Sequence, residues 1–99
     1  MKKVRFEWDK KKDLANLRNH GVAFGETKTV FYDENAIEFY DEDHSSKEVR
    51  FLMIGVSSKL RILLVSYTVR VRKDEDIIRI ISFRKATKNE QKIYFEGLI

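Results

Sequence analysis

Arginine side chains are the residues of this chain best suited to chemistry, because several of them fall at matching positions of predicted strands. Strand alternation places Arg50, Arg70 and Arg79 on the same side of a small sheet. A guanidinium fork fits the oxygens of a phosphate group, so this pattern favours a phosphate-binding site. The alternative is structural: Arg70 or Arg79 could pair with Glu48 or another carboxylate, as ion pairs commonly do.

The chain has two histidines, and each has a functional and a structural interpretation. His20 ends a predicted helix. The simpler, structural interpretation is that its side chain caps the last carbonyl groups of that helix. His44 lies in an acidic segment, in which His44 or Glu48 could serve as a general acid or base. Asp41 and Asp43 could join these two residues around a metal ion, but the spacing matches no defined metal loop and lacks the glycine of an EF-hand. We therefore expect neither a metal nor another cofactor.

Trp8, the only tryptophan, follows the first predicted strand. If it is exposed near the arginines, its indole ring could stack on an unpaired base. It could equally belong to the core or staple the start of the next helix. The sequence contains no Ser-His-Asp arrangement and no Gly-rich phosphate loop.

Composition limits what kind of protein this chain can be. Its 99 residues fit one domain, residues 1–99, and 42% of them are apolar, which is enough for one compact core. Because there are no cysteines, disulfides and zinc–thiolate sites are excluded. Apolar runs such as Ile62–Val65 are too short to cross a bilayer, and no apolar stretch follows the first residues, so we expect a cytoplasmic protein without a membrane partner.

Charge is distributed unevenly along the sequence. Residues 1–50 carry 10 Lys and Arg against 11 Asp and Glu, whereas residues 51–99 carry 10 against 5, within a formal net charge of +4. A basic half favours an anionic partner, of which nucleic acid is the commonest. The alternative is a solvated, slightly basic surface.

Hydrophobic periodicity predicts an α+β fold: a small antiparallel β-sheet with an N-terminal helical hairpin and a C-terminal helix. Asp9 is a good N-cap for a first helix that carries Leu14 and Leu17 as an apolar stripe and stops at Gly21. Thr87 begins a capping box for the last helix. The predicted strands cover residues 2–8, 36–40, 47–55, 60–72 and 77–84, and the predicted helices cover residues 10–20, 24–31 and 86–96.

The turn between the last two strands determines which of their residues face one another. A two-residue turn at Asp74-Glu75 would place Arg70 opposite Arg79. Two arginines that face each other repel unless an anion lies between them, so this register also favours a phosphate site.

Alternation over the last three strands then separates a core face from a polar face. Ser82 and Arg84 fall on the core side, together with Ile78 and Ile80. A one-residue slip would move Arg79 to the other side of the sheet. The polar face gathers Glu48, Arg50, Ser66, Thr68, Arg70 and Arg79.

Residues along nearly the whole chain resemble the BrnT-type toxins. Phe83 is a small departure, because a smaller residue is usual before the arginine that follows it. The positions that carry the resemblance are Phe6-Glu7-Trp8-Asp9, Lys12, Asn16, His20-Gly21-Val22, Phe24, Asp33, His44-Ser45, Glu48-Val49-Arg50, Ile54-Gly55, Tyr67-Thr68, Arg70, Ile78-Arg79-Ile80-Ile81-Ser82, Arg84-Lys85-Ala86, Glu90 and Tyr94.

The resemblance implies a RelE-like toxin of a bacterial type II toxin–antitoxin pair. Such toxins are ribonucleases that inhibit translation by cutting RNA without a metal. The partner would be a BrnA-like antitoxin, which neutralises the toxin and carries the complex to its operator DNA.

The resemblance and the strand pattern together suggest roles for the candidate residues. Arg79, with Arg70 or Arg50, would hold the phosphate and stabilise its extra charge. His44, His20 or Glu48 would move protons. The residues expected to bind the substrate are Arg50, Trp8, Arg84 and Thr68.

The sequence is also compatible with two other functions. The chain could be a non-catalytic module that binds the antitoxin and helps it to repress DNA. It could also bind DNA by itself, although none of the predicted helices concentrates Lys and Arg as a recognition helix does, and Lys10-Lys11-Lys12 comes closest.

Overall fold

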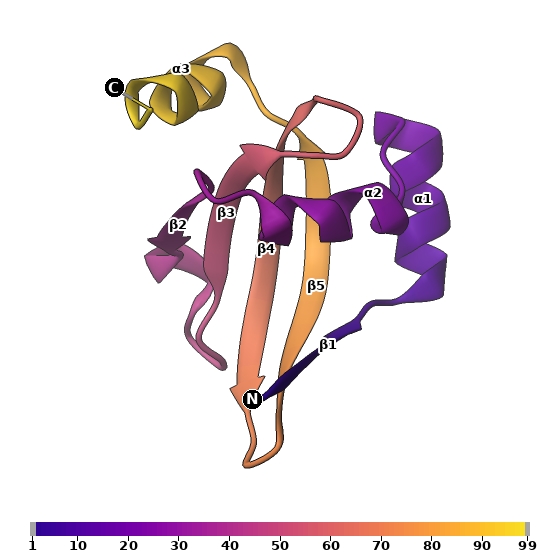
Figure 1. The fold of residues 1–99 in the computed structure, drawn as a ribbon. Helices are drawn as coiled ribbons and strands as arrows, with labels where there is room; N and C mark the ends of the chain where they lie inside the picture. The colour runs from indigo at the N-terminus through magenta and orange to yellow at the C-terminus, as the bar shows by residue number, and fades with distance from the viewer. Residues whose placement is uncertain (1, 99) are drawn as a thin grey trace.

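The computed structural model describes residues 2–98 and has an α+β fold, as predicted (Figure 1). The sheet order is β1-β5-β4-β3-β2, with β1 parallel to β5 and the remaining pairs antiparallel. The sheet is therefore mixed rather than wholly antiparallel. The elements are β1 (Lys3–Glu7), α1 (Lys10–His20), α2 (Phe24–Thr29), the 3₁₀ turn η1 (Val30–Tyr32), β2 (Ile37–Tyr40), the 3₁₀ turn η2 (Glu42–His44), β3 (Phe51–Val56), β4 (Ile62–Val71), β5 (Glu75–Lys85) and α3 (Lys88–Glu96).

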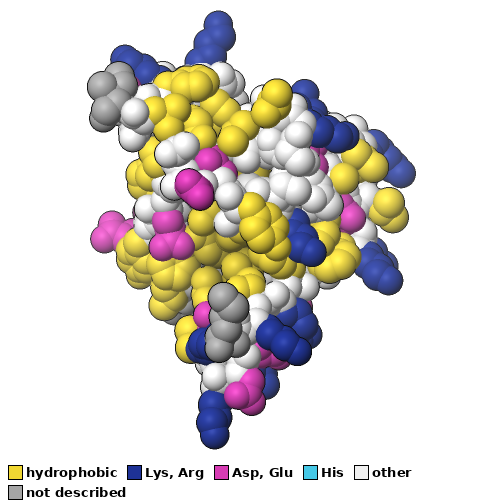
Figure 2. Space-filling model, viewed as in Figure 1, with side chains coloured by type: hydrophobic (Ala, Val, Ile, Leu, Met, Phe, Trp, Pro, Cys, Tyr) yellow, Lys and Arg dark blue, Asp and Glu magenta, His cyan; other side chains and the backbone are white. Residues whose placement is uncertain are grey.

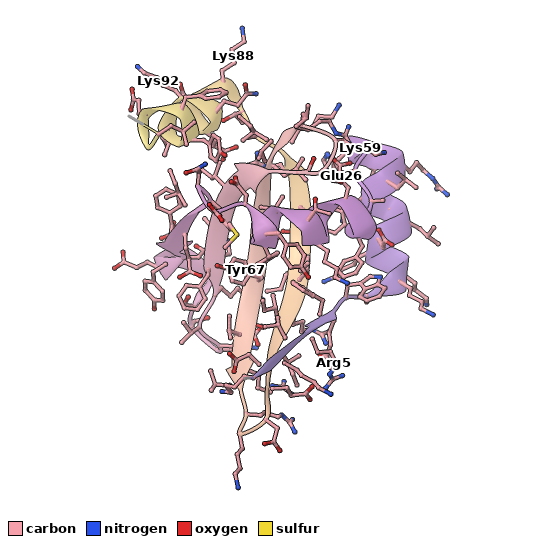
Figure 3. The ribbon with its side chains drawn as sticks, in the orientation of Figure 1. Arg5, Glu26, Lys59, Tyr67, Lys88 and Lys92 are labelled. Atoms are coloured by element: carbon pink, nitrogen blue, oxygen red, sulfur yellow. The ribbon has the colours of Figure 1, made fainter. Side chains whose placement is uncertain are left out.

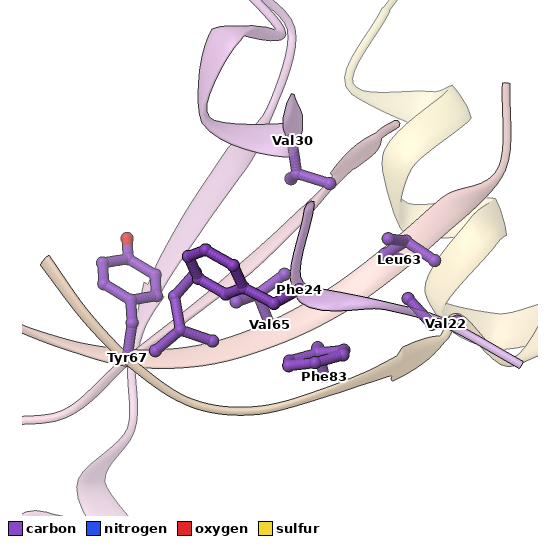
Figure 4. Close-up of a cluster of buried hydrophobic side chains, with 8 residues drawn as sticks. Val22, Phe24, Val30, Leu63, Val65, Tyr67 and Phe83 are labelled. Carbon is purple, nitrogen blue, oxygen red and sulfur yellow. The ribbon is translucent and has the colours of Figure 1, made fainter. Parts of the chain in front are cut away.

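The core lies between the sheet and α2 with η1, which cross one face of it (Figures 1 and 4). We call this side, on which Leu63, Val65 and Tyr67 lie, the α2 face. Phe24, Thr27 and Val30, which follow one another at intervals of three residues, are buried there. The cluster of buried side chains comprises Val22, Phe24, Val30, Leu63, Val65, Tyr67, Ile80 and Phe83.

The first helix differs from its prediction in what it buries. Asp9 caps it by accepting a hydrogen bond from the backbone N–H of Lys11, and Gly21 ends it with a positive φ of 66°, both as expected. However, Leu14 and Leu17 are 66% and 49% exposed, so the predicted apolar stripe is not part of the core. α1 packs on β5 and crosses the direction of α2 (Figure 1), so the two helices follow each other without lying side by side.

The β4–β5 register differs from the predicted one by two residues. The backbone N–H of Arg72 donates to the carbonyl of Glu75, so the turn lies one residue earlier than predicted. Arg79 consequently pairs with Thr68, and Arg70 pairs with Ile77. The prediction that Arg70 opposes Arg79 is therefore wrong. Because side chains alternate with a period of two, the shift leaves Arg79 on the same face as Arg70 and Thr68.

A β-bulge in β5 reverses the predicted orientation of the residues that follow it. Ile80 pairs with Tyr67, but Ser82 pairs with Ser66, so one extra residue is inserted in β5. Ser82 and Arg84 therefore lie on the polar side of the sheet, and the prediction that they share a side with Ile80 is wrong. Phe83, the departure from the family pattern, is turned into the core and is 4% exposed.

Polar contacts cap the start of the last helix and dock its second half. Thr87 and Glu90 form the predicted capping box. Tyr94, 4% exposed, donates its hydroxyl hydrogen to Asp33 at 2.7 Å. Burial raises the pKa of Asp33, but hydrogen bonds from Val56, Tyr94 and Asn35 outweigh it, and the pKa is lowered overall.

A buried ion pair joins α2 to the loop before β4. Glu26 lies close to the loop that carries Lys59 (Figure 3). Its carboxylate accepts hydrogen bonds from Ser57 Oγ at 2.6 Å and from Arg61, whose Nη2 also donates to the Gly21 carbonyl. These contacts hold the connections at this end of the sheet together.

Among residues 2–98, no helix is long and apolar enough to span a membrane.

Candidate active site

The side of the sheet opposite the α2 face carries a row of polar residues. Thr68 on β4 pairs with Arg79 on β5. Arg50 directly precedes the pair Phe51–Tyr67, so it lies beside Thr68 on the opposite flank. The two arginine backbones are thus two strand spacings, about 10 Å, apart. Arg70 is on the same side, diagonal to Arg79.

Two adjoining hollows form one groove next to this row, and we call this side of the sheet the groove face. Leu52, Ser66 and Ser82 belong to both hollows and make the shared floor of the groove. One hollow extends to His20 and the other to His44. The groove therefore has a histidine at each end, brought from α1 and from η2. The remaining lining residues are Asn16, Asp41, Arg50, Leu64, Ile81, Phe83 and Arg84.

The connection between β2 and β3 positions the residues at the His44 end. The backbone N–H of Asp41 donates to the carbonyl of Arg50 at 2.9 Å. The Ser45 hydroxyl donates to the Asp41 carbonyl at 2.5 Å and accepts from the Arg50 N–H at 3.0 Å. This closes the loop at its base and places His44 and Arg50 on the same hollow.

Charged groups at the His44 end are arranged around Arg50. The nearest Glu48 carboxylate oxygen is 3.6 Å from Arg50 Nη2, in an exposed contact. The Nε–H of Arg50 is buried and has no hydrogen-bond partner within residues 2–98. His44 Nδ1 is 3.0 Å from Asp41 Oδ2. The partly exposed guanidinium of Arg50, held among the described residues only by the 3.6 Å contact with Glu48, can bind an anion, and the neighbouring imidazole of His44 can transfer a proton.

The His20 end is shaped by the end of α1 and by Arg84. His20 and Asn16 are one helical turn apart and so point to the same side of α1. Arg84 lines the groove, but its Nη1 and Nη2 donate to Glu90 at 2.7 Å and 3.0 Å. This pairing lowers the pKa of Glu90 and raises that of Arg84. Arg84 is therefore engaged in docking α3, in addition to lining the groove.

The remaining two candidates lie at the far edge of the sheet. Arg79 is 54% exposed, and its Nη1 is 3.9 Å from Glu7, which is a loose contact. Trp8 stacks on Phe24, with ring centroids 3.7 Å apart, so one face of the indole is covered by the core. Trp8 and Arg79 line a shallow hollow together with Lys10.

Metal ligands do not gather at the acidic segment. Within the part of the chain that the structure describes, no three His, Asp or Glu side chains lie close enough together to hold a metal ion. Asp41, considered from the sequence only as a metal ligand, instead contacts His44. The spacing of Asp41 and His44, three residues apart in a single turn of chain, was the available signal for that contact.

The mixed sheet and its groove define a small α+β protein with guanidinium and imidazole groups collected on one sheet face. Residues 8–90 match the family model described as the ribonuclease toxin, BrnT, of a type II toxin–antitoxin system. The chain therefore belongs to the BrnT family.

A solved structure supports the same fold. The crystal structure of the ribonuclease toxin BrnT from Brucella abortus is similar to this chain with a TM-score of 0.61 and 23% sequence identity. The match covers 86% of this chain and 99% of the Brucella chain. No curated protein matches the sequence.

Proposed function

We propose that this chain is a metal-independent endoribonuclease, the RelE-like toxin of its toxin–antitoxin pair, and that it inhibits translation by cutting cytoplasmic RNA. The observation that carries the proposal is the groove with a histidine at each end, next to Arg50. Family membership supports a toxin with an RNA substrate. The arrangement supplies the groups that RNA cleavage needs without a metal.

The proposed reaction is an internal transesterification. The ribose 2′-oxygen attacks the adjacent phosphorus, the bond from phosphorus to the 5′-oxygen breaks, and a 2′,3′-cyclic phosphate remains. A base must take the 2′-hydroxyl proton, and an acid must protonate the departing 5′-oxygen. His44, His20 and Glu48 are the proton-transfer candidates.

Guanidinium groups would stabilise the charge that develops on the phosphate oxygens. Arg50 is the first candidate, because it lines the groove and its partly exposed guanidinium is held, within residues 2–98, only by a 3.6 Å contact with Glu48. Arg79 and Arg70 lie further along the same face, where they would hold the same or a neighbouring phosphate. Thr68 lies between Arg50 and Arg79 and would contribute a hydroxyl.

Trp8 would act on the substrate at its exposed indole face. Its other face is stacked on Phe24, which fixes the plane of the ring. A pre-positioned ring beside Arg79 suits an unpaired base, because stacking needs no rearrangement of the protein.

A BrnA-like antitoxin is the proposed protein partner, and operator DNA would be bound only through the complex with it. The lower half of the α2 face supports a protein partner, because α2 and η1 leave it uncovered (Figure 2). Val4, Tyr40 and Val71 are 55%, 55% and 72% exposed there. An apolar surface of this kind on a small protein commonly marks an interaction site.

The same apolar surface supports a second candidate function. A chain that binds its antitoxin, and so helps it to repress the operon, does not need to cut RNA. In that case the arginines of the groove face would serve only to bind a partner and would have no role in cleavage.

The test is RNA cleavage in EDTA by variants of the groove face. Arg50→Ala and Arg79→Ala are expected to cut about 100-fold more slowly or worse, since each removes a charge-stabilising donor. Arg18→Ala is the matched control, because Arg18 points to the side of α1 away from Asn16 and His20. Thermal unfolding checks that all variants are folded.

The outcomes separate the two functions. Wild-type cleavage rates in both groove variants would contradict the site assignment. A wild-type chain that binds its antitoxin tightly but cuts no RNA would favour the non-catalytic module.

A further inference from the structure

We infer that Asp41 is a positioning residue that holds the proton of His44 on Nδ1, so that Nε2 of His44 accepts the ribose 2′-hydroxyl proton. The inference rests on the proposed ribonuclease function and assigns one of the alternatives that it leaves open. It is carried by the contact between these two side chains at the end of the groove.

The contact between Asp41 and His44 is close and directional. Asp41 Oδ1 and Oδ2 lie 3.1 Å and 3.0 Å from His44 Nδ1. The Asp41 side chain is 11% exposed, whereas that of His44 is 65% exposed. The carboxylate is thus fixed in the protein, and the imidazole projects from it towards solvent and the groove.

Hydrogen bonds within the loop hold the backbone of Asp41 in place. The backbone N–H of Asp41 donates to the carbonyl of Arg50, and its carbonyl accepts from the Ser45 hydroxyl, so the residue is anchored on both sides of its side chain. The same hydrogen bonds place Arg50, the proposed phosphate ligand, next to the pair. One loop therefore sets the base and the phosphate site relative to each other.

The chemistry of the contact determines the tautomer. An ionised carboxylate can only accept hydrogen bonds, so the neutral imidazole beside it carries its hydrogen on Nδ1. Nε2, on the opposite side of the ring, is then left with the lone pair. A carboxylate plays this same role towards histidine in serine proteases, where it orients the ring and selects the tautomer.

The proposed proton movements balance. Nε2 of His44 takes the proton of the 2′-hydroxyl as the bond from the 2′-oxygen to phosphorus forms. The bond from phosphorus to the 5′-oxygen breaks, and protonated His20, at the other end of the groove, gives its proton to that oxygen. Exchange with water returns both histidines to their starting states.

Glu48 is less suited to this step than His44. Its carboxylate is 3.6 Å from Arg50 Nη2 and is thereby directed to the guanidinium. A carboxylate in that position neutralises part of the charge that the phosphate would otherwise use.

Nitrogen NMR of the free protein tests the tautomer without any need for activity. Spectra are recorded at about pH 8, where imidazole is ordinarily neutral. We expect His44 to show a protonated Nδ1 and an unprotonated Nε2 in the wild type, and to lose this preference in Asp41→Asn, whose amide can donate to Nδ1. The same tautomer mixture in both proteins would overturn the inference.

Cleavage kinetics test the role in the reaction. Asp41→Asn should lower kcat at least about tenfold with little change in KM, because proton transfer and not binding is impaired. Asp41→Glu, which keeps the carboxylate, should recover part of the loss. Glu42→Gln is the matched control: it removes one negative charge from the neighbouring residue and should leave kcat unchanged.

The outcomes distinguish this inference from the proposed function. Wild-type kcat in Asp41→Asn, with wild-type cleavage intact, would overturn the inference and leave the ribonuclease function standing. Absence of cleavage by the wild type would contradict the ribonuclease function and this role with it, whereas the NMR result would still decide whether Asp41 sets the tautomer. Equal losses in Asp41→Asn and Glu42→Gln would also overturn the inference, since they would reflect local charge alone.

Discussion

Glu26 is a buried carboxylate whose contacts supply most of the polar connection between α2 and the loop before β4. It is 6% exposed and is bonded to Ser57 and Arg61. The hydrogen bond from Arg61 lowers the pKa of Glu26 below its ordinary value of 4.5, against the opposing effect of burial. The stability that comes from this shift is therefore present above that pH and is lost as the pH falls through the lowered pKa.

Glu26→Gln should destabilise the protein by about 2–3 kcal/mol at neutral pH, because Arg61 and Ser57 lose a charged acceptor. The variant should also lose less stability than the wild type on acidification. Urea unfolding at about pH 7 and about pH 4 measures both effects. Equal acid sensitivity in the two proteins would contradict the account.

Tyr94 gives the opposite pH dependence. Burial, and after it the Asp33 carboxylate, raise the pKa of Tyr94 to about 12 from an ordinary value of 10.0. The stability that comes from this shift is fully present below pH 10.0 and is lost as the pH rises towards 12. Tyr94→Phe should cost about 1–2 kcal/mol at neutral pH and should flatten the alkaline loss of stability. An unchanged alkaline slope in urea unfolding would show that this hydroxyl is not responsible.

At the scale of elements, β3 depends on a close approach to the segment that crosses the α2 face. A Cβ atom on Gly55 would lie 2.8 Å from Val30 Cγ1 and 3.0 Å from Ala36 Cβ. The glycine thus allows β3 to pack directly under η1 and close to Ala36, the residue before β2. The same contact brings Asp33 within reach of the Val56 N–H, at 2.9 Å.

Gly55→Ala should cost about 1–3 kcal/mol, since the added methyl group overpacks this contact. Gly25→Ala is the control: a Cβ at Gly25 meets nothing within 4 Å, and alanine is the better residue in a helix. That variant should be neutral or slightly stabilised. Thermal unfolding compares them, and equal stability of the two variants would contradict the packing argument.

The sequence predicts the sheet face of a residue only where a local pattern of side chains determines it. Alternation sufficed to put Arg50, Thr68 and Arg79 on one face, because a two-residue register error leaves faces unchanged. The bulge in β5 reversed the side on which Arg84 lies, because Ile80 and Ile81 at the bulge are both apolar and no local pattern marks one of them as an inserted residue. The meeting of His20 and His44 on one groove depends on where α1 packs, which the sequence near either histidine does not encode.

The whole molecule separates two kinds of surface onto opposite sides of one sheet. The groove face carries guanidinium and imidazole groups, while the α2 face is apolar below α2 (Figure 2). The basic half of the sequence, residues 51–99, supplies β4 and β5, which form the centre of the groove face. Under the proposed function, RNA and the antitoxin therefore bind on different sides of the sheet.

RNA binding should weaken with salt in proportion to the phosphates that the groove face contacts. The log–log slope changes by about 0.7 for each phosphate contact on a single strand. Arg50→Ala should therefore reduce the slope by about 0.7, whereas Arg18→Ala should leave it unchanged. Binding of an uncleavable 2′-deoxy analogue over a salt series provides the measurement. An unaltered slope in Arg50→Ala would place the phosphate elsewhere.

The most direct test of the central claim is the chemistry of the cleaved ends. Wild-type protein is incubated in EDTA with an RNA and with the same sequence carrying 2′-deoxyribose, and the products are identified by mass spectrometry. The account predicts that only the RNA is cut and that the fragments end in a 2′,3′-cyclic phosphate and a 5′-hydroxyl. Cleavage of the 2′-deoxy strand, or 5′-phosphate ends, would contradict attack by the 2′-oxygen.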